Sequence, residues 1–428
     1  MPTAAASTTT ASKSRILALG FCAALFTIAL VRLAGMVAAN AVDVPCEDQW
    51  DALRFLFEDQ GPLAGFRQQH GPPRLGLSAV VDWYLYRATG WDVRAESWAC
   101  VAALGLSALL AMHLSARLRG RPSWRDAAFA LLILSPVTWE ALILTPFLAH
   151  SILPLLLVVL LAQAWTTTAP AIRLPAVGLL GGIALFSGFG FCAAFASVGL
   201  AMLLWIKPGG TVANRHQLLI PIGLFLVFAA WFAWGYRWDP AVPGWHFPVA
   251  NWWDYPRFMA LMFTNLLGLR SLGLLPTAAG GVVLAAVLGV WGLSTIRIVR
   301  GIATRRDNTI WLLASTSLAY AAFTAVGRLP VNIEAAFMWR YTPLTMPAIC
   351  ALLLASEELH ARSGLHHYAL VGTGLMFALT ATIWANFAPE RNAAAISRCK
   401  RTWVATYLAT GDLQTANEAS HYWVYWPN

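Results

Sequence analysis

Long apolar segments almost free of charge constrain this chain more than any other feature. Ile16–Ala39, Ala149–Trp165 and Leu274–Ile296 hold a single Asp, Glu, Lys or Arg residue between them, Arg32. A run of about 20 apolar residues matches the hydrocarbon thickness of a bilayer, and in lipid only a helix satisfies its own backbone hydrogen bonds. Charged residues make up 11% of the 428 residues, whereas soluble domains carry about 25%. The sequence therefore predicts an all-α polytopic membrane protein and not a soluble helical one.

Basic residues gather in short segments between the apolar ones, as the positive-inside rule predicts for cytoplasmic loops. Lys13 and Arg15 precede the first apolar segment, which puts the N-terminus in the cytoplasm. This distribution accounts for the net charge of +9 without a nucleic-acid surface. The later basic segments fall on the same side if the chain crosses the bilayer eleven times: Arg117–Arg125, Arg173, Lys207–Arg215 and Arg297–Arg306.

The eleven predicted spans leave the C-terminus outside. Residues 174–188 and 189–206 are separated by a glycine-containing break, so they can also form one hairpin dipping into the bilayer. Residues 258–270 contain Asn265 and end in Arg270, which predicts an interfacial helix and not a span. The predicted spans are 16–39, 97–116, 126–144, 149–166, 174–188, 189–206, 217–236, 274–296, 309–327, 341–357 and 368–387.

This topology divides the chain into three parts. Residues 1–14 are predicted to be a disordered cytoplasmic N-terminus, 15–387 the transmembrane domain, and 388–428 a short extracytoplasmic tail. Within the domain, residues 40–96 form the first outer loop. Apolar residues at helical spacing predict two short helices in this loop, around Trp50–Phe57 and Leu75–Ala88, lying at the membrane surface.

Carboxylates open this loop, just after the first span. Asp43, Glu47, Asp48 and Asp51 fall within nine residues. Such a group can be a solvated face, as is common in outer loops. Alternatively, a carboxylate between apolar anchors is partly desolvated, which raises its basicity and suits it to act as a base on a substrate at headgroup level.

Several short motifs accompany the acids. The chain resembles the GT-C superfamily, multi-spanning glycosyltransferases that use polyprenyl-phosphate-linked sugars, and most closely a poorly characterised bacterial branch of it. In these enzymes the first outer loop carries an acidic motif and continues through two interfacial helices. One departure is the stretch between His70 and Arg74, where a more polar link is expected. The matching segments are Pro45–Asp51, Gln69-His70, Arg74, Gly327-Arg328, and Arg340-Tyr341 before Pro343 and Pro347.

The resemblance implies a fold, a reaction and roles for these residues. The fold is GT-C-like, and the reaction is inverting transfer of a sugar from a polyprenyl-phosphate donor to a hydroxyl of a glycan, lipid or protein acceptor. A carboxylate would take the acceptor proton, and arginines would hold the donor phosphate. No metal or other cofactor is predicted. The candidates are Asp48 as base with Glu47 and Asp51 as alternates, Arg340, Arg328 and Arg74 for the phosphate, and His70 and Tyr341 for the substrate.

Four further residues are singled out by their predicted depth or side. Glu140 and His150 lie near the outer ends of predicted spans, where they either line a cavity or form a satisfied pair. Cys46 and Cys399 are the two cysteines in outer segments, and an oxidising periplasm could join them.

Two other functions stay open at this stage. A transporter or flippase of a lipid-linked glycan also needs many spans and headgroup arginines, but it predicts deep charges and an internal repeat, which the sequence lacks. A non-catalytic scaffold predicts that the loop acids are replaceable. No Asn-x-Ser/Thr sequon occurs and Ala and Arg abound, which favours a bacterial inner membrane with the site facing the periplasm.

Overall fold

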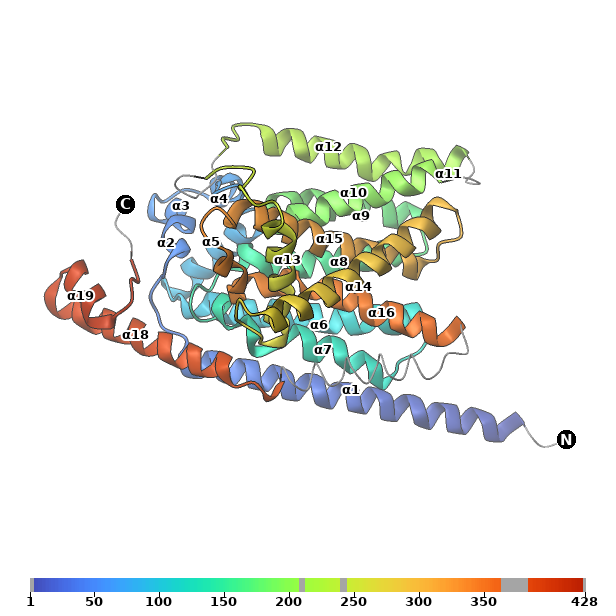
Figure 1. Ribbon diagram of the computed structural model, residues 1–428, viewed down its shortest axis with the longest axis horizontal. Helices are drawn as coiled ribbons and strands as arrows, with labels where there is room; N and C mark the ends of the chain where they lie inside the picture. The colour runs from blue at the N-terminus through green and yellow to red at the C-terminus, as the bar shows by residue number, and fades with distance from the viewer. Residues whose placement is uncertain (1–3, 208–211, 239–244, 363–383, 426–428) are drawn as a thin grey trace.

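The computed structural model describes residues 4–207, 212–238, 245–362 and 384–425, and in this part of the chain the regular structure is helical. Among these residues the β-type pairing is limited to one isolated bridge between Gln69 and Arg74. The long helices run along the longest axis of the molecule (Figure 1). The α-helices are α1 Ala4–Asn40, α2 Asp48–Ala52, α3 Arg54–Phe57, α4 Pro62–Arg67, α5 Leu77–Thr89, α6 Arg94–Arg119, α7 Ala127–Ile133, α8 Leu153–Thr166, α9 Pro170–Phe186, α10 Phe191–Ile206, α11 Val212–Gln217, α12 Leu219–Ala233, α13 Asp254–Thr264, α14 Leu274–Val299, α15 Arg305–Arg328, α16 Met346–Arg362, α18 Ala388–Thr410 and α19 Leu413–Ser420.

Short 3-10 and π turns join several of these helices. Most lie between residues 124 and 190 or between 265 and 344. They are η1 Trp124–Asp126, η2 Pro136–Ala141, the π-helical η3 Leu148–Ile152, η4 Gly188–Gly190, η5 Asn265–Leu267, η6 Ile333–Phe337 and η7 Trp339–Leu344.

Seven helical segments of the described chain are long and apolar enough to cross a bilayer, which confirms an all-α architecture of membrane type. The count of eleven is not reproduced by this criterion. The seven are Ser14–Asn40, Arg94–Arg119, Leu148–Thr166, Gly188–Ile206, Arg215–Ala233, Leu274–Val299 and Arg305–Arg328.

Three expectations about helices are wrong. Residues 126–144 do not form one span, because α7 ends at Ile133 and Pro136 starts the 3-10 helix η2. Proline has no amide hydrogen and disfavours helical backbone in the residue before it, so a helix tends to end there. The span expected from 341 begins only at Met346, after a 3-10 turn that contains Pro343. The N-terminus is helical from Ala4 and not disordered up to residue 14.

The segments 174–206 and 258–270, which the sequence did not assign to simple spans, form separate helices. α9 and α10 are two helices packed against each other, with η4 between them. α13 is a short helix whose Phe258, Leu261 and Phe263 are buried, and it packs on α14. Most of the predicted span 368–387 lies outside the described residues.

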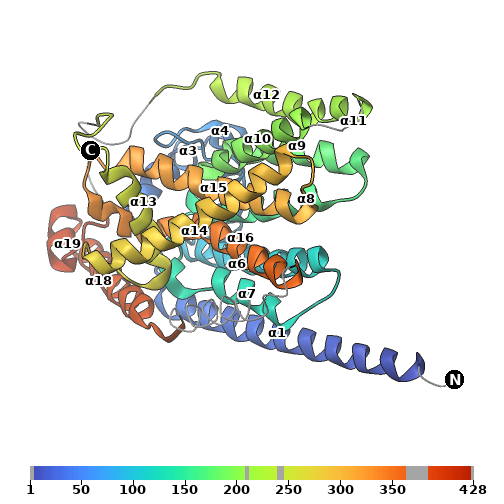
Figure 2. The ribbon, with the colours of Figure 1, turned by 45° about the vertical axis from the view of Figure 1, so that its right-hand side comes forward.

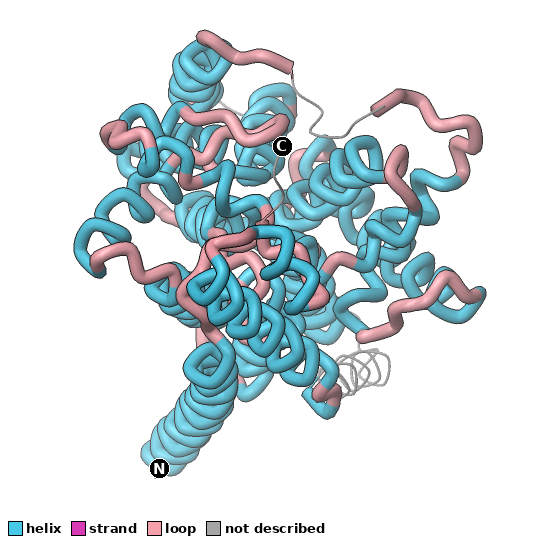
Figure 3. The backbone as a smooth tube through the Cα atoms, turned by 90° about the vertical axis from the view of Figure 1, so that its left-hand side faces the viewer, coloured by secondary structure: helices cyan, strands magenta, loops and turns pink. Residues whose placement is uncertain are grey.

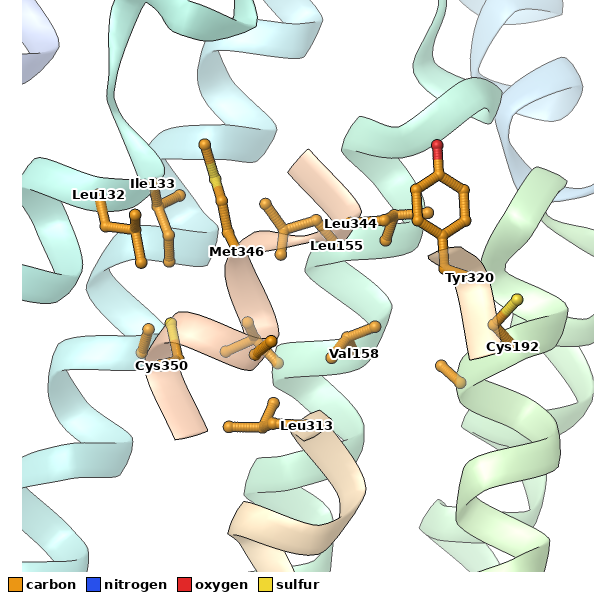
Figure 4. Packing of buried hydrophobic residues seen from close by; sticks show 14 of the residues in the cluster. Leu132, Ile133, Leu155, Val158, Cys192, Leu313, Tyr320, Leu344, Met346 and Cys350 are labelled. Carbon is orange, nitrogen blue, oxygen red and sulfur yellow. The ribbon is translucent and has the colours of Figure 1, made fainter. Parts of the chain in front are cut away.

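The core between the long helices is apolar. Side chains of α7, α8, α10, α15 and α16 meet there, and Leu155, Leu313 and Leu344 are almost fully buried (Figure 4). In a membrane a leucine gains little by exchanging lipid for protein, so close van der Waals packing of these side chains holds the helices that carry the loops.

The helical segments predicted in the first outer loop are present as α2, α3 and α5. The inward face of α5 is partly polar, with Asp82 and Tyr86 buried. Its Leu77 and Val81 are half-buried and Tyr84 is 61% exposed. Leu77 and Val81 pack against the core, and the exposed residues of α5 are Tyr84, Arg87, Ala88 and Thr89, so its outer surface is mixed and not apolar.

The C-terminal tail is not a separate segment, since it packs onto the first loop. α18 and α19 lie at the same end of the molecule as α2 and α3 (Figures 1 and 2). Figure 3 looks onto this end. A small apolar cluster joins the two segments: Val44, Cys46, Trp403, Ala416 and Val424.

The predicted basic turns lie at the opposite end, where α1 starts, α6 ends and α15 begins (Figure 1). Arg117 at the end of α6 and Arg305 at the start of α15 both donate to the carbonyl of Thr166. The two ends of the helix bundle thus differ in chemistry, one basic and the other carrying the acidic loop.

Candidate functional site

An open pocket of about 800 Å³ lies at the end of the molecule that carries the first loop. Its walls come from that loop, from the turn before α8, from η4 and from the end of α15. The pocket brings together most of the residues singled out in the sequence: Asp48, Asp51, His70, Arg74, His150 and Arg328 line it.

Asp48 is held by the turn on which it stands. It is the first residue of α2, and the next residue, Gln49, is fully buried. The Gln49 side chain accepts a hydrogen bond from the Cys46 amide at 3.1 Å and donates to Glu96 Oε2 at 3.1 Å. It also donates to the carbonyl of Pro146. The acidic turn is therefore fixed to α6 and to the loop before η3.

Arg340 lies beside two of the acids. Its Nη1 is 3.2 Å from Asp48 Oδ2 and 3.3 Å from Glu47 Oε2. Its backbone amide donates to Glu140 Oε2 at 3.0 Å. The residues predicted as base, phosphate ligand and intramembrane acid thus form one connected group, in which one guanidinium is shared between two carboxylates.

These charges act on Asp48 in opposite directions. Burial alone would raise the pKa of the Asp48 carboxyl, but Arg340, followed by His70, His150 and Arg328, brings it below its ordinary value of 3.8. The side chain is still 33% exposed and lines the pocket. Asp48 is therefore an ionised carboxylate that a ligand in the pocket can reach.

Glu47 is engaged on both oxygens and is not among the pocket-lining residues. Its Oε1 accepts a short hydrogen bond from the Tyr422 hydroxyl, and its Oε2 accepts one from Thr145 at 3.3 Å. Its backbone has φ 51° and ψ −124°, a conformation that side-chain-bearing residues rarely adopt. This geometry suits a residue that ties the tail to the loop. Asp51 is exposed at the rim of the pocket.

Besides Arg74, two arginines of the pocket have no carboxylate partner within 4.0 Å in the described part of the chain. Arg328 reaches the pocket from the last turn of α15. Arg67, which the sequence did not single out, lies over the Trp234 ring at 5.0 Å and has a buried Nε without a partner. A guanidinium can pair with two oxygens of a phosphate, so both suit an anionic ligand.

The two histidines both pack against Phe147. His70 packs edge-on against its ring at 5.8 Å, and His150 does so at 6.1 Å. His150 stands in the π-helical turn η3, and its buried Nε2 has no partner within the described structure. Its ring also lies 6.2 Å from that of Tyr341, whose hydroxyl is likewise unpartnered. Of the two residues, His150 lines the pocket and Tyr341 does not, so the His150 ring is the one that a ligand in the pocket can contact.

The prediction that Arg74 binds phosphate does not fit the structure. Its guanidinium is almost fully buried and donates to the backbone carbonyls of Arg67, Phe232 and Trp234. Since all three nitrogens are used, Arg74 joins the first loop to the end of α12.

The predicted disulfide is absent as well. Cys46 and Cys399 are free thiols. Cys46 is fully buried in the cluster with Trp403 and Val424, whereas Cys399 is partly exposed. Apolar packing, and not a covalent bond, therefore attaches the tail to the loop.

Several residues that complete the site had no signal in the sequence. Gln49 stood next to the acids, but only the fold brings it to Glu96. Tyr422 was one of several tail aromatics, and nothing in their spacing favoured it. Lys400 is fully buried and donates from Nζ to the carbonyl of Ile143 at 2.9 Å, which holds α18 against the loop after η2.

No cluster of three or more His, Cys, Asp or Glu side chains suited to a metal ion occurs among the described residues. Comparison of the chain with family models, with curated proteins and with solved structures finds no match.

Proposed function

We propose that this chain is an inverting glycosyltransferase of GT-C type. It would move a sugar from a polyprenyl-phosphate donor to a hydroxyl of a glycan, lipid or protein acceptor, at the periplasmic face of a bacterial inner membrane. One observation carries the proposal: the ionised carboxylate of Asp48 lines the same pocket as the guanidinium of Arg328, which has no carboxylate partner among the described residues. A base and a cation for the departing phosphate are the two groups that this reaction requires.

The proposed reaction is a single displacement. The acceptor oxygen attacks the anomeric carbon while Asp48 takes its proton. The bond from that carbon to the phosphate oxygen breaks, and the electron pair stays on the phosphate, which Arg328 stabilises. Attack from the face opposite the leaving group inverts the anomeric centre. A positioned base contributes about 10²–10⁴-fold to the rate.

Arg340 has a separate task in this scheme. Arg340 is not among the residues that line the pocket, and its guanidinium forms ion pairs with Asp48 and Glu47. A carboxylate paired with an arginine is a weak base. The negative donor phosphate, bound at Arg328, would offset the field of the arginines and so raise the basicity of Asp48 when the substrate is present.

The experiment is transfer by the purified protein in lipid vesicles with a panel of polyprenyl-phosphate-linked sugars, measured as release of polyprenyl phosphate. Asp48→Asn should lower turnover by about 10²-fold or more. Asp59→Asn is the matched control, because Asp59 is an exposed acid of the same loop, 86% exposed and paired with Arg87. Undiminished transfer by Asp48→Asn would exclude it as the base.

The same preparation separates the proposal from a lipid flippase. If the Asp48→Asn protein still moves the lipid-linked sugar across the vesicle membrane and the wild type shows no transfer with any donor, the chain is a transporter. Arg328→Gln tests the phosphate site: it should raise KM for the donor, whereas Arg391→Gln, an exposed arginine of α18, should not.

A further inference from the structure

A second and larger pocket opens at the opposite end of the molecule. It is about 960 Å³ in volume and is lined by seven arginines but only one carboxylate, Glu357. The lining residues come from the start of α1, the end of α6, the segment from there to η1, and the start of α15. Segments far apart in sequence therefore converge on a strongly cationic site.

The acids at this end neutralise only two of the arginines. Arg119 pairs with both Asp126 and Glu357, and Arg306 lies 3.6 Å from Glu357. The other five arginines of the pocket have no carboxylate within 4.0 Å in the described structure: Arg15, Arg117, Arg121, Arg125 and Arg305.

Two of these five arginines share one hydrogen-bond acceptor. Arg117 and Arg305 donate to the same carbonyl, that of Thr166, at 3.3 and 3.5 Å. Arginines that gather around one pocket without carboxylate partners in the described structure repel each other, and an anion bound among them would relieve this repulsion. Cytoplasmic loops that merely obey the positive-inside rule have no need to gather their arginines around one cavity.

One wall of the pocket continues into a lipid-facing surface. Ser14, Arg15 and Ala18 line it from α1. On the same helix, Leu17 is 74% exposed and Phe21 is 42% exposed. A ligand that places phosphates among the arginines can thus lay an apolar chain along α1.

We propose that this pocket binds the phosphate headgroup of an anionic phospholipid of the surrounding membrane, with an acyl chain against α1. Basic pockets between transmembrane helices on the cytoplasmic side are suited to such headgroups, and the planar guanidinium pairs with two phosphate oxygens. The site is independent of the carboxylate pocket at the other end, so neither proposal depends on the other.

The test is native mass spectrometry of the full-length protein in detergent, titrated separately with cardiolipin and with phosphatidylcholine. One cardiolipin per chain should be retained, and phosphatidylcholine should be lost. Arg121→Gln/Arg125→Gln should weaken cardiolipin retention by roughly tenfold to thirtyfold, since each arginine near an anionic headgroup contributes a few-fold. Arg15→Gln, on a different element, should weaken it by a smaller factor and serves if the double variant does not fold.

Arg300→Gln is the matched control, because Arg300 is an exposed arginine at the C-terminal end of α14 and does not line the pocket. It should retain cardiolipin like the wild type. Equal losses in Arg300→Gln and the pocket variants, or equal retention of phosphatidylcholine, would overturn the proposal. So would complete displacement of the lipid by inorganic pyrophosphate, which would identify a soluble phosphate as the ligand.

Discussion

Replacing Arg340 by glutamine removes the cation that two carboxylates share. The side chain of Arg340 is 15% exposed, that of Glu47 is 25% exposed and that of Asp48 is 33% exposed. Removing one partner of a fully buried pair costs about 3–5 kcal/mol, whereas an exposed pair is worth about 0–1 kcal/mol. The partial exposure places this group between the two limits, so we expect Arg340→Gln to lose about 2–3 kcal/mol of folding free energy near pH 7.

The loss should depend on pH in a defined direction. Arg340 holds the pKa of Asp48 below 3.8 against the effect of burial, so this carboxyl contributes stability above its unfolded pKa and loses it as the pH falls through the lower folded value. Without Arg340 the burial term is less opposed, and the pKa of Asp48 rises. The stability difference between wild type and variant should therefore be full near neutral pH and shrink below about pH 3.8.

The assay is unfolding in detergent micelles, followed by intrinsic tryptophan fluorescence, with wild type, Arg340→Gln, Asp48→Asn and the double variant. If the interaction is direct, the two single losses should not add, because either substitution removes the same contact. Strictly additive losses, or a difference that stays constant into the acid range, would refute the pairing of Arg340 with Asp48 as its source.

Two further experiments probe the wall of the carboxylate pocket at Gly188 and the contact between the tail and the first loop at Cys46. Gly188 has φ +54°, and a Cβ there would lie 1.7 Å from the carbonyl oxygen of Ala149, so Gly188→Ala should cost about 2–4 kcal/mol in the same unfolding assay. Gly181→Ala, with open space around its Cβ, should be near neutral. Burial raises the pKa of the Cys46 thiol to about 12, so a maleimide near pH 7 should label Cys399 and spare Cys46 in the folded protein. Labelling of both at equal rates, or a disulfide on non-reducing gels, would contradict this arrangement.

The features that the sequence predicted correctly are those that follow from a local hydrophobic pattern. The long apolar helices and the helices of the first loop follow from hydrophobic spacing over 10 to 25 residues, a signal that each segment carries by itself. The same reasoning failed at 126–144, a mostly apolar segment in which α7 ends at Ile133 and Pro136 begins the 3-10 helix η2. Hydropathy measures whether a segment can enter a membrane and is insensitive to where its backbone bends.

The predicted phosphate ligands show which features a local sequence pattern cannot predict. Arg74, Arg328 and Arg340 could not be distinguished in the sequence, since each is an arginine in a predicted outer segment. The fold gives them three different tasks: Arg74 binds backbone carbonyls of α12, Arg340 binds carboxylates, and Arg328 is left without an ion-pair partner among the described residues. Their partners are more than 150 residues away in two of the three cases.

Long-range contacts also give the three acids of the first loop different surroundings. Glu47 is bound by Tyr422, which lies 375 residues further along the chain, by Thr145 and by Arg340, and it is absent from the pocket lining. Asp51 points to solvent at the rim. Asp48 alone of the three combines an arginine contact with a place in the wall of the pocket. A base must be both ionised and within reach of the acceptor proton, so the geometry favours Asp48 over its neighbours for a reason that one continuous stretch of sequence could not contain.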